Sequence, residues 1–171
     1  MCMRRMAVGG LILLSMIGGL FAGGPKDTGN PDVRYFALVV GIADYADSNI
    51  QDLNYTDDDA NSMGFTLWSQ FPNWDNYYIT TYIDASATKG AIQSRLFYFA
   101  SQADTNDVVL FYFSGHGTKD QYHEYIVPWD AVHDTPSTYI SDDELQGWLN
   151  NIPAKKVVII DACFSGGMIL G

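Results

Sequence analysis

Short apolar runs alternate with segments of helical periodicity along most of the chain. The runs are rich in β-branched and aromatic residues and have the length of buried strands. They cover residues 34–41, 77–83, 107–113 and 156–161. Between them, apolar side chains recur at intervals of three and four residues, which predicts helices over residues 57–71, 88–103 and 141–152.

Repeated strand–helix units of this kind predict an α/β fold with a parallel, doubly wound sheet and right-handed crossovers. The run 107–113 is apolar throughout, so we expect it near the middle of the sheet. Residues 118–140 interrupt the pattern, and we expect loops there with a short strand at 124–127.

The expected helices carry caps and apolar faces. Thr56 and Thr88 can cap the first two helices, and Ser141 followed by Glu144 forms a capping-box pattern at the third. The inward positions are Ala60, Met63, Leu67, Trp68 and Phe71 in the first helix, Ile92, Leu96, Phe99 and Ala103 in the second, and Leu145, Trp148, Leu149 and Ile152 in the third.

The N-terminal residues have the layout of a secretory signal peptide. Arg4 and Arg5 precede an apolar run at 6–22, and small residues follow it. We therefore expect a signal peptide at 1–22, a linker at 23–33 and an exported protein in the extracellular space, periplasm or cell envelope. The alternative is an uncleaved anchor, because the run can nearly span a bilayer, and only then would the protein be held at a membrane.

Charge and cysteine content narrow the function. The 171 residues suit one domain, and the net charge of −11 argues against nucleic acid, whose phosphates attract Lys and Arg. Cys2 lies in the expected signal peptide, which leaves Cys163 as a lone thiol and excludes a disulfide framework.

Two motifs follow strands directly, where ligands bind in open α/β sheets. The strand at 107–113 leads into Ser114-Gly115-His116-Gly117, and the strand at 156–161 leads into Asp161-Ala162-Cys163-Phe164-Ser165-Gly166-Gly167. If these strands are neighbours, the imidazole of His116 and the thiol of Cys163 lie on one rim, where His can activate a thiol. The backbone amides of Gly117 and Cys163 can then face a developing oxyanion.

Each of these residues also has an ordinary structural interpretation. A single Cys after an apolar strand is often a small buried hydrophobe, and a lone His is often structural. His123 and His133 fit the structural interpretation, because they lie in the 118–140 excursion without a matching nucleophile.

The two motifs together strongly resemble the caspase-like cysteine peptidases, more closely the prokaryotic and metacaspase branches than the animal caspases. Residues 35–42 resemble the family's first strand, and residues 53–60 resemble its first loop and helix start. The likeness covers residues 34–171, which we take as the peptidase domain. It implies the three-layer caspase–hemoglobinase fold, with helices on both faces of a mostly parallel sheet. Legumain-like or gingipain-like enzymes are an alternative within the clan, but the run 161–166 favours the caspase branch.

The resemblance implies a cysteine endopeptidase acting on peptides or proteins through a Cys–His dyad. Cys163 would attack the scissile carbonyl, His116 would protonate the leaving amine, and an acyl-enzyme would form. The amides of Gly117 and Cys163 match the family's oxyanion hole. The alternative is a catalytically silent caspase-like binding or scaffold module.

The resemblance also implies a preference for substrates with Arg or Lys. Asp161 and Asp59 match the acidic positions of metacaspase-like enzymes, and a pair of carboxylates favours a guanidinium. Asp57 and Asp58 are alternatives to Asp59. In the structural interpretation, Asp59 stabilises a helix N-terminus and Asp161 accepts local hydrogen bonds.

Many metacaspases need calcium, and Asp142 and Asp143 resemble two of their calcium-binding acids. The other two positions correspond to His123 and Leu170, neither of which is a good hard-oxygen ligand. The proposed chemistry itself needs no cofactor, and helix capping explains Asp142 and Asp143 without a metal.

The chain ends at Gly171, whereas the family continues with further strands and helices. We therefore expect a fragment without the C-terminal strands, or a chain that needs a partner segment. In that case the strand at 157–160 would form an exposed, apolar sheet edge.

Overall fold

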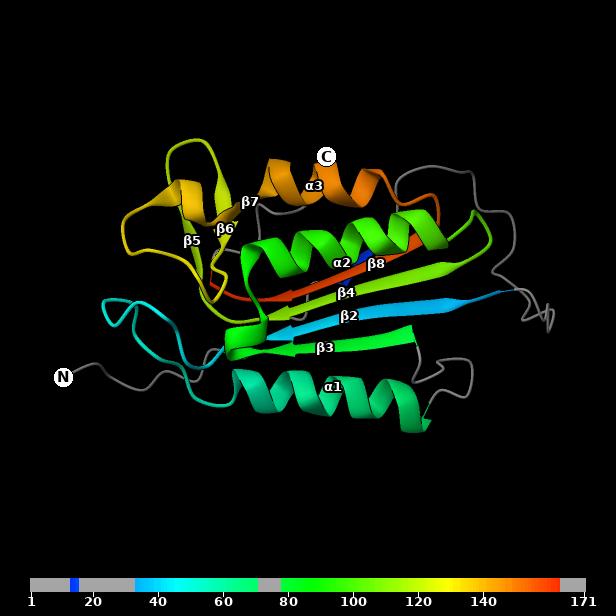
Figure 1. Cartoon of the computed structure of the whole chain (residues 1–171), viewed down its shortest axis with the longest axis horizontal. Helices are drawn as coiled ribbons and strands as arrows, with labels where there is room; N and C mark the ends of the chain where they lie inside the picture. The colour runs from blue at the N-terminus through cyan, green and yellow to red at the C-terminus, as the bar shows by residue number, and fades with distance from the viewer. Residues whose placement is uncertain (1–12, 16–32, 71–77, 164–171) are drawn as a thin grey trace.

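The computed structural model describes residues 13–15, 33–70 and 78–163. A five-stranded sheet with the order β1-β8-β4-β2-β3 forms its centre (Figure 1). Its strands are β1 (Leu13–Ser15), β2 (Tyr35–Gly41), β3 (Ile79–Ile83), β4 (Val108–Ser114) and β8 (Lys155–Asp161). All neighbouring pairs are parallel except β1 and β8. The expected parallel sheet is confirmed, and β4 lies at its centre.

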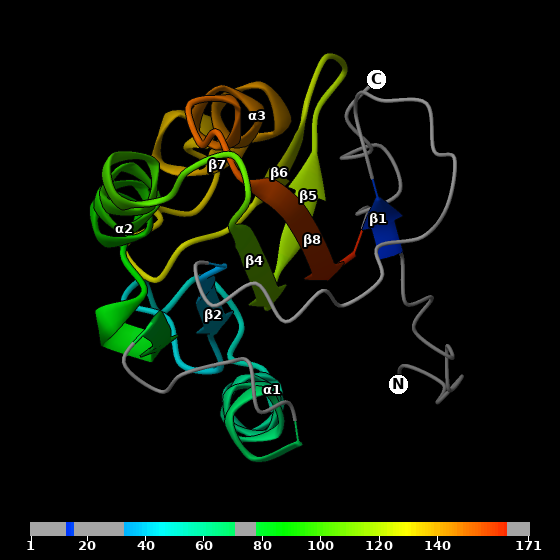
Figure 2. The same ribbon diagram turned by 90° about the vertical axis from the view of Figure 1, so that its right-hand side faces the viewer.

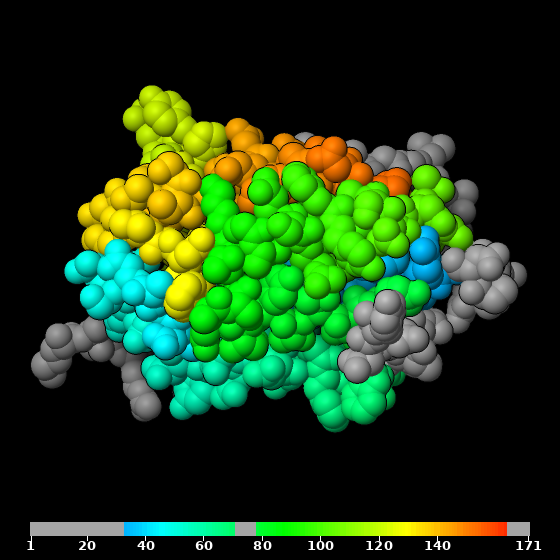
Figure 3. All heavy atoms as spheres, in the orientation of Figure 1, coloured from blue at the N-terminus to red at the C-terminus, as the bar shows by residue number. Residues whose placement is uncertain are grey.

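Helices cover both faces of the sheet and give three layers. The helix α1 (Thr56–Gln70) lies on one side, and α2 (Lys89–Gln102) and α3 (Asp142–Asn150) lie on the other (Figure 2). In the space-filling view, α2 in green and the loop in yellow form a continuous surface (Figure 3). The layers agree with the α/β caspase-like fold that the resemblance implied.

The inner strands β2 and β4 are buried on both faces, which explains their continuous apolar runs. Along β2, Phe36, Leu38 and Val40 pack toward α2 and α3, in the larger of two core clusters. Ala37 and Val39 alternate with them and pack toward α1 in the smaller cluster. The expected inward residues of α2 and α3, and Ala103 and Ile152 just beyond the helix ends, are buried as predicted.

The packing face of α1 is narrower than expected. Ala60, Gly64 and Leu67 are buried, but Trp68 is 53% exposed, so its expected inward position is wrong. The cause is a close approach of α1 to β3, because a Cβ added at Gly64 would lie 2.9 Å from Thr81 Oγ1. A contact centred on Gly64 leaves the flank that carries Trp68 facing solvent. Phe71 lies outside the described residues.

The start of one helix differs from the cap that its sequence predicts. Thr88 caps α2 by accepting a hydrogen bond from Ala91 N–H, and Ser141 with Glu144 forms the expected capping box. Thr56 is already the first residue of α1, and its hydroxyl donates to the carbonyl of Ile42 at 2.6 Å. It therefore ties the start of α1 to the end of β2 instead of capping the helix.

The 118–140 excursion contains more structure than its sequence pattern showed. A second, antiparallel sheet joins β5 (Gly117–Lys119), β6 (Glu124–Ile126) and β7 (Ile140–Ser141), of which only β6 was predicted. Short 3₁₀ helices lie at Asp84–Ser86 and Pro136–Thr138. Strands of two or three residues are too short to leave a period in the sequence.

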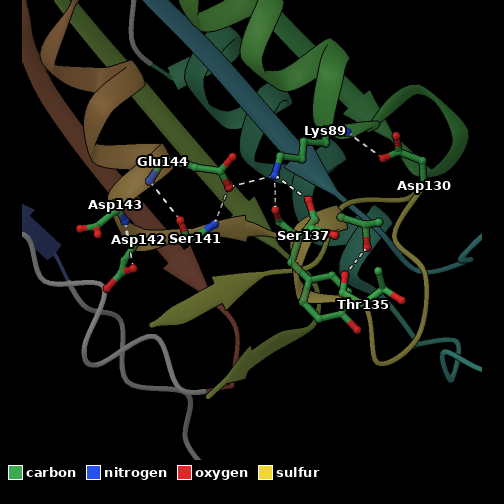
Figure 4. Close-up of polar contacts among 10 residues, drawn as sticks. Lys89, Asp130, Thr135, Ser137, Ser141, Asp142, Asp143 and Glu144 are labelled. Carbon is green, nitrogen blue, oxygen red and sulfur yellow. Dashed lines mark hydrogen bonds and ion pairs between the residues drawn. The ribbon is translucent and has the colours of Figure 1, made fainter. Parts of the chain in front are cut away.

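Lys89 connects the 118–140 segment to the helices α2 and α3, which cover the same face of the central sheet (Figure 4). Its ammonium donates to the carbonyl of Ser137 at 3.3 Å and to Glu144 Oε2 at 2.9 Å. Its backbone N–H donates to Asp130 Oδ1 at 2.8 Å. One side chain at the start of α2 thereby links the loop to the first turn of α3.

β1 lies within the expected signal peptide and pairs antiparallel with β8. In the chain that retains residues 13–15, residues 157–159 therefore have a neighbouring strand, and the expectation of an open edge along β8 is wrong for them in that form. No helix in the described part of the chain is long and apolar enough to cross a bilayer.

Candidate active site

The two predicted motifs leave the sheet side by side. β4 and β8 are parallel neighbours, and Ser114 at the end of β4 pairs with Asp161 at the end of β8. Gly115 N–H donates to the carbonyl of Asp161 at 3.3 Å, which continues the pairing beyond the strand ends. The condition for a shared rim, that these two strands are neighbours, is therefore met, and both motifs begin at one rim.

Gly117 brings the backbones of the two motifs into contact. A Cβ added there would overlap the carbonyl oxygen of Cys163 and lie 3.1 Å from the Cβ of Ala162. Glycine is therefore required for the close approach of this loop to the Cys163 segment. The thiol of Cys163 is free and exposed, so the interpretation of Cys163 as a buried hydrophobe is wrong. Residues 164–167 of the motif lie outside the described residues.

The imidazole of His116 is held by the loop between β2 and α1. Its Nε2 lies 2.6 Å from the carbonyl oxygen of Gln51. A carbonyl oxygen only accepts, so this contact places the proton on Nε2 and leaves Nδ1 as the basic nitrogen. The ring is therefore oriented and in one tautomer, as an acid–base group requires.

Tyr45, in the same loop, also contacts both the backbone and the ring of His116. Its hydroxyl accepts the backbone N–H of His116 at 2.8 Å, and the two rings lie 5.2 Å apart between centroids. Sequence reasoning missed both Tyr45 and Gln51. The only sequence feature that could have identified them is their place in the chain, because their loop follows a strand that ends at the same rim.

Acidic side chains gather on the α1 side of this rim. Asp161 ends β8, Asp59 lies in the first turn of α1, and both are exposed. Partial burial, followed by the negative charges of Asp161, Asp58 and Asp57, raises the pKa of Asp59. The structure thus places Asp59 and Asp161 within electrostatic range of each other.

Tyr112 lies beneath these acids and was not singled out by its sequence. It is 6% exposed, and burial is the main cause of its raised pKa, with contributions from the charges of Asp59 and Asp161. Residues 49–59 contain no Lys or Arg. The arrangement therefore concentrates negative charge on this side of the rim.

His123, Asp142 and Asp143 form a separate cluster at the start of α3. The ligand atoms of these side chains lie within 4.8 Å of one another. His123 Nδ1 lies 3.0 Å from Asp142 Oδ1 and 3.7 Å from Asp143 Oδ2, and Asp142 Oδ1 also accepts Asp143 N–H at 2.9 Å. Figure 4 shows both carboxylates beside the Ser141–Glu144 capping box.

These residues do not fit calcium. The ion takes six to eight oxygen ligands, and an imidazole nitrogen here contacts the two carboxylates instead. Leu170, the fourth position implied by the resemblance, lies outside the described residues.

Known proteins resemble this chain in sequence and in fold. A family model described as Caspase domain matches residues 34–170. Metacaspase-1 of Plasmodium falciparum is 31% identical over 152 residues, 78% of this chain and 24% of that protein. Metacaspase-4 of Arabidopsis thaliana is 28% identical over 110 residues, 56% of this chain and 25% of that protein.

A solved structure shares the fold. Protein GSU0716 from Geobacter sulfurreducens superposes with a TM-score of 0.63 at 20% identity, over 76% of this chain and 50% of that one. The chain spans about a quarter of the length of the two metacaspases. The match of the family model over most of the sequence shows that this chain belongs to the caspase family of cysteine peptidases.

Proposed function

We propose that the protein is a cysteine endopeptidase that uses Cys163 and His116. The observation that supports this proposal most directly is the meeting of two strand ends at one rim. There Gly117 contacts the Cys163 backbone, the thiol is exposed, and the His116 ring is oriented by a carbonyl. These are the elements of a thiol nucleophile with an adjacent base.

The proposed reaction has two stages. The Cys163 thiol gives its proton to His116 Nδ1, and the thiolate attacks the scissile carbonyl carbon to form a tetrahedral oxyanion. The imidazolium then protonates the leaving amine, the C–N bond breaks, and a thioester remains. Water attacks the thioester with His116 taking its proton, and the acid product leaves as the thiol is restored. The N–H groups of Gly117 and Cys163 would stabilise the oxyanion.

The acidic side of the rim supports a preference for Arg or Lys at the cleaved bond. Asp59 and Asp161 attract a cation, and two carboxylates can also bind both edges of a guanidinium. The same negative field disfavours a substrate Asp.

Cleavage of fluorogenic peptides by the full-length natural protein tests the proposal. We expect cleavage after Arg and Lys, slower cleavage after Asp, and none by the Cys163→Ala variant. Activity that persists in Cys163→Ala would contradict the nucleophile, and faster cleavage after Asp would contradict the acidic site. A folded wild type that cleaves nothing, and that an electrophilic peptide does not label at Cys163, would favour the silent scaffold module.

The proposed chemistry requires no metal, and the His123 cluster supports calcium-independent activity. The replacement His123→Asp would add a third carboxylate beside Asp142 and Asp143, so we expect this variant to gain a calcium-dependent rise in Tm. The wild type should show little rise, measured by thermal unfolding with calcium and with a chelator. A large calcium-dependent rise in the wild type would contradict this view.

We further propose that the protein is exported, with residues 1–22 as its signal peptide. The support is the order of basic, apolar and small residues. Mass determination of the N-terminus of the natural, secreted protein tests this. A protein retained in the cytosol with Met1 or Cys2 at its N-terminus would contradict it.

A further inference from the structure

Tyr45 is a buried contact of His116. It lies in the loop after β2, is 5% exposed and belongs to the larger core cluster. Its hydroxyl accepts the His116 N–H at 2.8 Å, and its ring lies against the imidazole at an interplanar angle of 36°. One side chain thus contacts both the backbone and the ring of the candidate acid–base residue.

The loop that carries Tyr45 is itself held in place. Tyr45 N–H donates to Asp52 Oδ1 at 3.1 Å, and Leu53 N–H donates to the carbonyl of Ala43 at 2.8 Å. Asp84, from the end of β3, accepts the N–H groups of Ala43 and Asp44 at 2.8 and 3.0 Å. The Tyr45 hydroxyl is therefore presented from a fixed backbone.

The space around this contact is tight. A Cβ added at Gly115 would lie 3.1 Å from the Tyr45 hydroxyl and 2.9 Å from Phe113 Cζ. Burial raises the pKa of Tyr45, so its hydroxyl stays neutral across the physiological range. A neutral, buried hydroxyl that accepts a backbone N–H gives His116 a fixed main-chain position without adding charge.

Tyr45 and Gln51 constrain His116 in different ways. Gln51 accepts from Nε2 and so determines the tautomer and the ring rotation. Tyr45 fixes the backbone from which the ring projects and covers one of its faces. Both contacts come from one loop, so the orientation of the His116 ring, and with it of Nδ1, depends on the loop as a unit.

We propose that Tyr45 is a positioning residue for the cysteine peptidase reaction, acting through the backbone N–H and ring face of His116. The proposal rests on the proposed function, because it assigns Tyr45 a role only if His116 is the acid–base group. It predicts that the Tyr45 hydroxyl contributes to proton transfer between Cys163 and His116, beyond its contribution to stability.

The replacement Tyr45→Phe tests this, because it keeps the aromatic ring and removes only the acceptor. We expect kcat for an Arg peptide to fall about tenfold or more, the scale on which a displaced catalytic group loses rate, with KM nearly unchanged. The pH midpoint for alkylation of Cys163 should also move up, because a displaced imidazole takes the thiol proton less readily.

Tyr125→Phe in the full-length protein is the matched control. Tyr125 is also buried, at 8% exposure, and its hydroxyl makes one hydrogen bond, to Asp120 at 2.7 Å, without contacting His116. We expect a similar small loss of Tm in both variants, with the alkylation midpoint unchanged in the control.

The outcomes separate this proposal from the proposed function. An unchanged kcat and an unchanged alkylation midpoint in a folded Tyr45→Phe protein would overturn the positioning role while leaving the peptidase intact. A fall in kcat with no shift of the midpoint, matched by the control, would show a structural role only and also overturn it. Wild-type activity that survives Cys163→Ala would instead overturn the proposed function.

Discussion

His116 shows how much the behaviour of a candidate acid–base group is determined by its neighbours. The side chain alone offers two nitrogens that exchange one proton freely. The carbonyl of Gln51 removes that freedom at one nitrogen, and the hydroxyl of Tyr45 fixes the backbone. A single imidazole thereby becomes a directed base without any charged partner among these contacts.

At the same scale, Asp161 is expected to set affinity for a cationic substrate. The replacement Asp161→Asn removes one charge from the acidic side of the rim, so KM for Arg peptides should rise about tenfold, the loss expected for one charge-assisted hydrogen bond. Steady-state kinetics measure this, with Asp104→Asn as the control because Asp104 lies before β4, at the opposite end of the sheet. Equal effects of the two replacements would contradict a role for Asp161.

The raised pKa of Asp59 predicts a pH effect. A carboxyl with a raised pKa takes up its proton at a higher pH than an ordinary Asp as acid is added. The kcat/KM for Arg peptides should therefore begin to fall at a higher pH than an ordinary Asp would cause. Because the charge of Asp161 contributes to this shift, Asp161→Asn should move the acidic fall in kcat/KM to lower pH. If the fall in kcat/KM stays at the same pH in this variant, Asp59 does not control binding.

At the scale of elements, the same residue type has opposite consequences in two helices. Gly64 in α1 faces β3 closely, whereas a Cβ added at Gly147 in α3 meets nothing within 4 Å. Helix propensity favours Ala over Gly at both positions. Packing therefore decides the difference between them.

We expect Gly147→Ala to raise the free energy of unfolding by up to about 1 kcal/mol, the difference in helix propensity between Gly and Ala. Gly64→Ala should lose that gain, because its Cβ would lie 2.9 Å from Thr81 Oγ1 and force α1 away from the sheet. Urea titration of both variants checks this comparison. A Gly64→Ala variant that is more stable than the wild type would show that the Thr81 side chain can move away from the added Cβ without destabilising the fold.

At the scale of the molecule, the chemistry and a main source of stability lie at opposite ends of the sheet. The carboxyl ends of β4 and β8 carry the His116 and Cys163 motifs. At the amino ends, the carboxylate of Asp107 is fully buried and accepts from the backbone and guanidinium of Arg34 at 2.7 and 2.8 Å. It also accepts Asp104 N–H at 2.9 Å, and so joins the starts of β2 and β4.

Asp107→Ala should therefore lower the free energy of unfolding by about 3 kcal/mol or more, because buried donors lose a charged acceptor. Asp104→Ala, which removes the exposed ion pair with Arg34 and the exposed acceptor of Asn106 N–H, should cost less than about 1 kcal/mol. Thermal and urea unfolding measure both. The kcat of the folded fraction should not change, and a selective loss of kcat would contradict the separation of stability from chemistry.

Sequence periodicity was sufficient for the strands of the central parallel sheet and for the helices. A strand buried on both faces must be apolar throughout, and a helix must repeat its apolar side chains every three or four residues. Adjacency of the two motifs was only a condition in the sequence, because two strands of one parallel sheet need not be neighbours, and the pairing of β4 with β8 decided it. The narrow face of α1 did not follow, because Gly64 places α1 against β3 through a contact between distant residues.

The sequence by itself thus determined the α/β class, the His116 and Cys163 motifs and the caspase-like character of the chain. Tertiary structure decided the second sheet, the pairing of β1 with β8, the contact of Asp142 and Asp143 with His123, and the placement of Tyr45 and Gln51 around His116. The physical reason is the separation along the chain of the residues that make each contact. Periodicity records which face of an element is buried, whereas a loop contact depends on where two distant backbones come to lie.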